Sequence, residues 1–394
     1  MPEQDLDTKV DSGLIADTAL ESTPSNSDRL RTVKSAVRLP RRLWPTDPVS
    51  RLRRLIKRTL KQDRASYVQL ECPVQSFEAQ QMAAKRRITS TWGNFRPDAM
   101  ESRGTILMAI YQPDAVLYPS TVRTLAEFAA LGYCTVVINS VPDPNPLLLA
   151  QLQKVADVVI HREGGGRDFS SWLTAILAHY SDVTQSREVI LINDSLVGPV
   201  RSIESMMNAR HDCHADLWGL SENPERAYHL QSSLLSILGS YFASDDFKQF
   251  LCMYPFPDDR DLVIVFGEIG ISQHALRAGA KLGVLCPYME CCEYWLQDFR
   301  DNYYTSMTED KPQDAAWYAG VKNLLVTARP VNPQHFFWDT MIRHYGYPFL
   351  KRELLFSNPA GVRNLKDLPK IVGSDAISKL ISGELIGLRP GWPT

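Results

Sequence analysis

Between residues 104 and 193, short apolar runs alternate with longer segments whose apolar residues recur at helical spacing. Apolar runs that stop at a turn residue predict strands, and apolar spacings of three and four residues predict helices. Alternating strands and helices are typical of an α/β fold with a mostly parallel sheet flanked by helices. The pattern predicts strands at 105–111, 134–139, 157–161 and 189–193, with helices at 120–131, 146–156 and 168–180.

The pattern is looser after residue 194. We expect a strand at 215–220, a helix at 231–241, and an apolar strand at 262–266 leading into a helix that ends near Gly279. From about residue 300 the chain is aromatic and basic. The sequence therefore predicts one α/β domain over 104–299 and a helical C-terminal extension over 300–394 that packs on it.

The N-terminal part divides by charge into an acidic tail at 1–28, which we expect to be disordered, a basic segment at 29–66 and a connecting segment at 67–103. Within the basic segment, residues 48–61 can form a helix with an apolar side. Basic amphipathic helices bind anionic membrane surfaces, although such a helix can also pack on the protein core. The apolar side is made of Leu52, Leu55, Ile56 and Leu60.

Composition removes several classes of function. The net charge of −2 argues against a nucleic-acid partner. Seven cysteines without framework spacing indicate a reducing, cytoplasmic compartment. No apolar stretch reaches the roughly 20 residues that span a bilayer, so the basic segment predicts a peripheral location at the inner face of the plasma membrane.

The run 189–193 ends in Asn193, Asp194 and Ser195. Ligands of open α/β sheets bind at the carboxyl ends of the strands, so these side chains are candidates for donor binding and catalysis. Asp194 is also a candidate ligand for Mg²⁺ or Mn²⁺, because hard cations prefer carboxylate oxygens. A single carboxylate supplies few ligands for a metal ion. A simple turn or helix cap is the alternative interpretation of these residues.

A glycine-rich loop precedes the helix expected at 168–180. Gly165, Gly166, Arg167 and Asp168 follow a predicted strand, and such a loop lets a diphosphate approach the backbone at a helix N-terminus. The spacing differs from a dinucleotide fingerprint or a P-loop. Asp168 could instead be the N-cap of the helix.

Two further groups are candidates for chemistry. Glu268 follows the strand expected at 262–266, where a carboxylate can act as a general base; the alternative is a glutamate that stabilises a helix start. His229, Gln231 and Ser232 cluster at one loop and suit a hydroxyl-rich ligand, with a helix cap and a structural histidine as alternatives.

Together these segments resemble the rhamnan synthesis protein F family, whose members look like GT-A glycosyltransferases. The resemblance covers about residues 104–360. The segments that carry it are Gly166 and Asp168 with Trp172, residues 191–195 with Gly198 and Pro199, 216–219, 229–232, 268–272 with Gly279, Asn332 with Pro333, Trp338, 348–355, and Asn358 with Pro359. The family usually has asparagine at the position of Gly164.

The resemblance implies a GT-A-like, Rossmann-like domain that transfers a sugar with inversion. The donor would be a nucleotide-sugar such as dTDP-rhamnose, and the acceptor a growing, lipid-linked cell-surface polysaccharide or lipopolysaccharide glycan. Asp216 and Trp218 would join His229, Gln231 and Ser232 in binding sugar. The base would be Glu268, because Ile269 stands at the position of the second acid of the family's motif.

Two other functions stay open at this point. A catalytically silent glycan- or nucleotide-binding scaffold is consistent with the single carboxylate at Asp194 and with Gly164. A nucleotide-dependent enzyme of another class is the third hypothesis, because a fold does not determine its chemistry.

Overall fold

The computed structural model describes residues 74–112, 117–299 and 312–373. The expected acidic tail at 1–28 and the basic segment at 29–66 lie outside the described residues.

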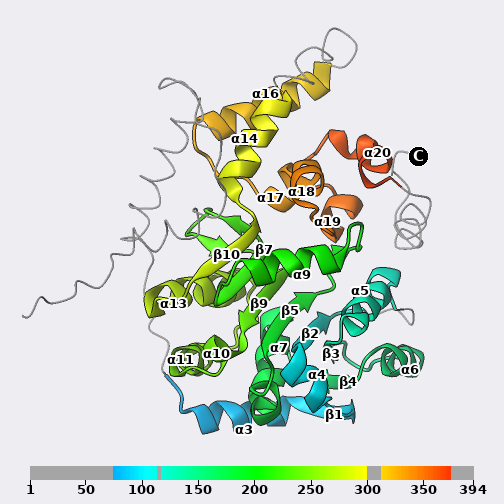
Figure 1. Ribbon diagram of the computed structural model, residues 1–394, viewed down its shortest axis with the longest axis vertical. Helices are drawn as coiled ribbons and strands as arrows, with labels where there is room; N and C mark the ends of the chain where they lie inside the picture. Colours follow the sequence, from blue (N-terminus) through cyan, green and yellow to red (C-terminus); the bar gives the residue numbers. More distant parts are fainter. Residues whose placement is uncertain (1–73, 113–116, 300–311, 374–394) are drawn as a thin grey trace, which may run out of the picture.

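A nine-stranded sheet forms the centre of the described chain (Figure 1). Pairing gives β2, β3, β4, β5, β7 and β10 a common direction, while β1, β8 and β9 run the other way. The spatial order is β1 (Ile88–Gly93), β4 (Val158–Arg162), β3 (Cys134–Asn139), β2 (Thr105–Ile110), β5 (Glu188–Asn193), β9 (Leu234–Leu238), β7 (Leu217–Asn223) and β10 (Leu282–Cys286), with β8 (His229–Leu230) paired to β7.

The strand order reverses beside β2. From β2 the chain proceeds through β3 to β4 on one side, then returns to place β5 on the other side of β2. The crevice beyond the carboxyl ends of strands at such a reversal is the usual ligand site of open α/β sheets. Tyr111 and Asp194, which directly follow β2 and β5, lie at this edge.

Helices cover both faces of the sheet because its strands alternate buried side chains between them. Ile106 and Met108 of β2 belong to one apolar cluster and Leu107 to the other. The first face is covered by α5 (Pro119–Ala130), α6 (Pro146–Val155) and α9 (Ile203–Asp212); the second by α3 (Phe77–Arg87), α7 (Arg167–Ala178), α10 (Gly239–Phe242), α11 (Asp245–Met253) and α13 (Gly270–Ala278).

The C-terminal part packs into the first of these clusters. Its short strand β11 (Leu350–Lys351) pairs with β6 (Leu196–Val197), just after β5. Gly198 makes this possible, because a Cβ there would come within 2.7 Å of the Pro348 carbonyl oxygen. Helix α14 (Tyr288–Asp298) leads into this part, whose described helices are α16 (Pro312–Val326), α17 (Pro333–Phe336), α18 (Trp338–Tyr345), α19 (Arg352–Phe356) and α20 (Leu368–Val372), with a 3-10 turn at Asn364–Asp367.

The predicted α/β class and its mostly parallel sheet are confirmed, and the strands and helices expected between 104 and 193 are all present. The sheet begins earlier than expected, because α3, β1 and α4 (Pro97–Ser102) lie within 67–103 and β1 pairs with β4.

Two of the expected elements are wrong. The helix expected at 231–241 is largely strand β9, whose Leu234 and Leu235 are buried on opposite faces. A strand buried on both faces has no polar alternation, so periodicity cannot distinguish it from a buried helix. The strand expected at 262–266 is helical, because Asp259 caps a helix by accepting hydrogen bonds from the backbone N–H groups of Asp261 and Leu262.

The packing of the C-terminal part predicts a large stability difference between two Leu→Ala substitutions. Leu355 of α19 is fully buried, whereas 66% of Leu147 is exposed. We expect Leu355→Ala to lower the free energy of unfolding by about 2–5 kcal/mol and Leu147→Ala by less than about 0.5 kcal/mol, as measured by urea denaturation. Equal effects would show that α19 is not part of the core.

Candidate active site

One large cavity opens at the carboxyl edge of the sheet. Its volume is about 920 Å³, within the size range of small-molecule sites. Asp168, Asp194 and Glu268 all line it. The three acids singled out in the sequence therefore lie at one cavity, while their roles stay predictions.

The glycine-rich loop forms part of the wall. Gly166 is the N-cap of α7 with a φ of 84°, a left-handed conformation that glycine adopts without strain. A Cβ at Gly165 would come within 2.1 Å of the Asp258 carboxylate, so this loop also packs closely against residues 257–258. Asp168 is the second residue of α7, so its interpretation as the N-cap is wrong.

A buried arginine, which the sequence analysis missed, holds this loop. Arg162 ends β4, and its guanidinium donates to the carbonyl oxygens of Gly165 (2.8 Å) and Arg167 (3.3 Å) and to the Ser171 hydroxyl (3.0 Å). Burial lowers the pKa of Arg162 to about 10, so its charge persists at neutral pH. The sequence did contain a signal for Arg162, because a charged residue at the end of an apolar strand is unusual.

Hydrogen bonds join the glycine-rich loop to the end of β5. The Asn193 amide donates to the Asp168 carboxylate at 2.6 Å, and its oxygen accepts from the Ser195 backbone N–H at 3.2 Å and from the Ser195 hydroxyl. The Trp172 indole N–H, which donates to the Ile192 carbonyl oxygen at 3.1 Å, anchors α7 on the same strand. Burial raises the pKa of Asp168, opposed by the hydrogen bond from Asn193.

Asp194 lies at the strand reversal. Its Oδ2 accepts from the backbone N–H of Tyr111 at 2.9 Å and from the Gln112 amide at 3.3 Å. Burial raises the pKa of Asp194, and the Tyr111 hydrogen bond with the charge of Arg352 opposes the shift. A carboxylate with a raised pKa is a better proton acceptor than an unperturbed one.

Glu268 reaches the cavity from a continuous helical segment. α12 (Arg260–Val263) leads into a π-helix at Ile264–Ile269 and then into α13. Gly267 lets this segment cross α7 closely, because a Cβ there would come within 2.5 Å of the Phe169 ring. The crossing brings Glu268 to the same wall as Asp168, and π-helical turns are common at functional sites.

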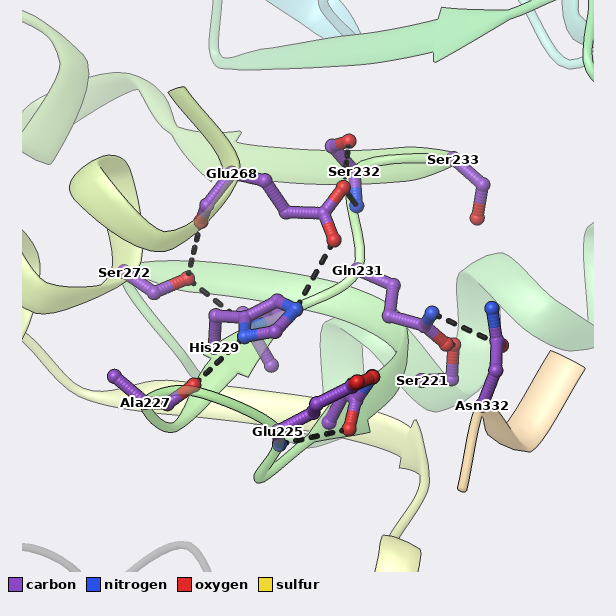
Figure 2. A network of polar contacts seen from close by, with 12 residues as sticks. Ser221, Glu225, Ala227, His229, Gln231, Ser232, Ser233, Glu268, Ser272 and Asn332 are labelled. Atoms are coloured by element: carbon purple, nitrogen blue, oxygen red, sulfur yellow. Dashed lines mark hydrogen bonds and ion pairs between the residues drawn. The ribbon is translucent and has the colours of Figure 1, made fainter. Parts of the chain in front are cut away.

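Figure 2 shows Glu268 between His229 and Ser232. Its carboxylate lies 3.0 Å from His229 Nε2 and accepts from the Ser232 backbone N–H at 3.3 Å and from the Ser232 hydroxyl. His229 Nδ1 lies 2.8 Å from the Ala227 carbonyl oxygen, which can only accept, so Nδ1 carries a proton. Nε2 faces a carboxylate and therefore carries one too when Glu268 is ionised.

The contact between Glu268 and His229 shifts their two pKa values in opposite directions. Burial would raise the pKa of Glu268, but the hydrogen bond and charge of His229, with the Ser232 hydroxyl, bring it down to about 2. Burial would lower the pKa of His229, and Glu268 raises it above 6.5. The pair is thus an imidazolium beside a carboxylate, and so low a pKa makes Glu268 a weaker base than the sequence predicts.

A lysine from the C-terminal part, also missed, reaches into the cavity. The Lys351 ammonium donates to the Ser195 hydroxyl at 2.8 Å. Burial lowers the pKa of Lys351, and the opposing attraction comes from the carboxylates of Glu268, Asp168, Glu353 and Asp194. Position 351 was already part of the family resemblance, but nothing in its neighbourhood marked it as facing the carboxylates.

The expected Mg²⁺ or Mn²⁺ site at Asp194 stays a prediction, and the acids around it are engaged by protein donors. Such an ion usually keeps several waters and takes one or two carboxylates together with the phosphates of a substrate. Here Asp194, Asp168 and Glu268 each accept hydrogen bonds from protein donors, and the charges of all three act on the Lys351 ammonium. Across 74–112, 117–299 and 312–373, no three His, Cys, Asp or Glu side chains are grouped to hold a metal.

Two of the predicted sugar-binding residues lie elsewhere. Asp216 precedes β7 at the opposite edge of the sheet, where its carboxylate accepts from the Lys281 backbone N–H at 2.7 Å. Trp218 is 1% exposed and packs in the core. Strand direction explains the correction: the end of β7 that reaches the cavity is Asn223.

The remaining sugar-binding candidates do line the cavity. His229, Gln231 and Ser232 face it, and the Gln231 amide donates to Asn332 Oδ1 at 3.2 Å while its oxygen accepts from the Ser221 hydroxyl (Figure 2). Asn332 comes from the C-terminal part. The wall therefore combines strand ends, the helix bearing Glu268 and the extension.

Comparisons with known proteins agree with the resemblance. Residues 135–300 match the model of the family described as rhamnan synthesis protein F, so the resemblance is confirmed over this range. The chain is 29% identical over 254 residues to the virulence protein VirA of Vibrio anguillarum (strain ATCC 68554 / 775), covering 61% of this chain and 76% of that protein.

A solved structure, described as a nucleotide-diphospho-sugar transferase from Desulfovibrio desulfuricans G20, aligns with 58% of this chain and 99% of its own at 14% identity. The TM-score of 0.30 is too low to identify a shared fold.

Within the part of the chain that the structure describes, we find no helix of the length and apolar character that crossing a membrane requires.

The His229–Glu268 pair has a defined pH window. The His229 pKa is raised on folding, so its contribution to stability is full below pH 6.5 and is lost as the pH rises through the folded value. The Glu268 pKa is lowered from 4.5 to about 2, so its contribution is present above pH 4.5 and is lost as the pH falls towards 2. The pair stabilises the fold most between these limits.

Replacing Glu268 should reverse the shift at His229. In Glu268→Gln, burial acts without the opposing carboxylate, so we expect the His229 pKa to fall from above 6.5 to below it. NMR titration of the imidazole carbons measures this midpoint, with the His229→Gln spectrum assigning the signal among eight histidines. An unchanged midpoint in Glu268→Gln would contradict the ion pair.

Proposed function

We propose that this protein is a glycosyltransferase that moves a sugar from a nucleotide-sugar to a hydroxyl of a growing glycan. The observation that carries the proposal is the 920 Å³ cavity at the strand reversal, whose wall combines three acids, a glycine-rich helix start and a lysine. The match of residues 135–300 to the rhamnan synthesis family supports the same chemistry.

We assign different tasks to the groups of residues that line the cavity. The loop at Gly165 and Gly166 leads into the N-terminus of α7, where backbone N–H groups favour a phosphate. His229, Gln231 and Ser232 present polar groups to sugar hydroxyls. In its more specific form, the proposal names dTDP-rhamnose as the donor and a lipid-linked glycan as the acceptor.

We assign the proton acceptor to Asp194. Transfer forms a bond from the acceptor oxygen to the anomeric carbon and breaks the bond from that carbon to the diphosphate oxygen. The acceptor hydroxyl must lose its proton, and the raised pKa of Asp194 suits this task better than the pKa of about 2 at Glu268. Glu268, held ionised by His229, instead stabilises positive charge growing on the sugar.

Binding to the inner membrane face remains a proposal that rests on the basic segment 29–66, which lies outside the described residues. Liposome co-sedimentation of the full chain and of a chain lacking residues 1–66 tests it.

Asp194→Asn should abolish most turnover without unfolding the protein. Removing the proton acceptor should cost about 3 kcal/mol of transition-state stabilisation, or roughly a hundredfold in rate. Release of nucleoside diphosphate from a panel of UDP-, GDP- and dTDP-sugars measures the rate. Asp216→Asn, at the far edge of the sheet, is the matched control and should keep wild-type turnover.

Turnover of Asp194→Asn at the wild-type rate would exclude the assigned role. Bound nucleotide without turnover in the wild type would favour the scaffold hypothesis.

The pH–rate profile separates the two acids. Wild-type kcat/KM should fall at low pH as Asp194 becomes protonated, with a midpoint above the ordinary aspartate value of 3.8. Glu268→Gln should lower the rate but keep this acid limb, whereas the residual activity of Asp194→Asn should lack it. Loss of the limb in Glu268→Gln alone would make Glu268 the base.

A further inference from the structure

Lys351 brings a positive charge to the cavity wall beside the end of β5. Its ammonium donates to the Ser195 hydroxyl at 2.8 Å and lines the same cavity as Asp168, Asp194 and Glu268, whose charges act on it. Each of those carboxylates accepts a hydrogen bond from the protein itself.

The backbone holds Lys351 firmly at this point. β11 pairs with β6, placing Lys351 opposite Leu196. The next residue adds two contacts, because the Arg352 backbone N–H donates to the Ser195 carbonyl oxygen at 2.7 Å and its Nε donates to the Asp194 carbonyl oxygen at 2.9 Å. A lysine carried on a paired strand is positioned more tightly than one on a free loop.

Hydrogen bonds connect the ammonium to the glycine-rich helix start. Lys351 donates to Ser195, Ser195 donates to Asn193, and Asn193 donates to Asp168 in the first turn of α7. The ammonium and the N-terminus of this 12-residue helix therefore line one part of the cavity. Both attract the same ligand chemistry, an anion with phosphate oxygens.

We propose that Lys351 supplies the positive charge that holds the donor's diphosphate and stabilises it as leaving group, so that transfer needs no divalent cation. The inference rests on the proposed function and specifies its cofactor requirement. When the bond from the anomeric carbon to the diphosphate oxygen breaks, its electron pair stays with the diphosphate, and the Lys351 ammonium neutralises the added charge. The acceptor proton passes to Asp194.

Calorimetric titration of the full chain with UDP, GDP and dTDP tests the inference without any acceptor. We expect the nucleotide that binds in Mg²⁺ to bind within about threefold as tightly in EDTA. Lys351→Met should weaken that binding at least tenfold in EDTA, and Lys351→Arg, which keeps the charge, should stay within a few fold of wild type. Turnover of the matching nucleotide-sugar in EDTA should follow the same order.

Lys370→Met is the matched control, since the Lys370 side chain on α20 is 83% exposed and pairs with Asp367, the residue before that helix. It should bind like the wild type. Thermal unfolding of each variant shows whether a loss of binding reflects loss of the fold, and Lys351→Arg provides the second variant if Lys351→Met does not fold.

The outcomes separate the two proposals. Wild-type binding or turnover that requires Mg²⁺ or Mn²⁺ would overturn the role of Lys351 and leave the glycosyltransferase standing. Equal nucleotide binding by Lys351→Met and the wild type would also overturn the role of Lys351 and leave the glycosyltransferase proposal standing. Failure of every nucleotide, with or without metal, would overturn both.

Discussion

The site depends on one electrostatic constraint: three carboxylates that line one cavity must each have a compensating partner. A carboxylate removed from water without compensation protonates instead. Here each acid is compensated differently, Glu268 by the His229 imidazolium, Asp194 by backbone and amide donors, and Asp168 by Asn193. The Lys351 ammonium attracts all three. Because the partners differ, the pKa values diverge, and divergent pKa values let neighbouring acids take different tasks.

The fold brings these groups together through close backbone approaches. Gly267 permits the crossing that sets Glu268 beside the first turn of α7, and Gly198 permits the C-terminal strand to reach β6. In each case a Cβ would collide with a ring or a carbonyl oxygen. The architecture of the sheet thus defines an edge, while two glycines determine which side chains share it.

Much of this arrangement is predictable from the sequence where the signal is local. Strand and helix periodicity located every element between 104 and 193, and strand-end placement identified Asp168 and Asp194. Local patterns could not locate β9, which is buried on both faces. They also could not show that Asp216 lies before the start of β7, at the edge of the sheet away from the cavity. Lys351 could not be predicted as a site residue, because its position depends on the pairing of β11 with β6, 155 positions earlier, which no local pattern encodes.

That long-range pairing bears on where the functional unit ends. The family match stops at residue 300, yet Asn332 and Lys351 lie beyond it, and Tyr111, whose backbone N–H binds Asp194, lies before it. A protein limited to 135–300 would retain the three acids but lose the ammonium and both donors to Asp194 Oδ2, the Tyr111 backbone N–H and the Gln112 amide. Since like charges in a cavity repel unless compensated, such a fragment would protonate its acids or rearrange. The C-terminal part is therefore a component of the site's charge balance as well as a packing partner of the core.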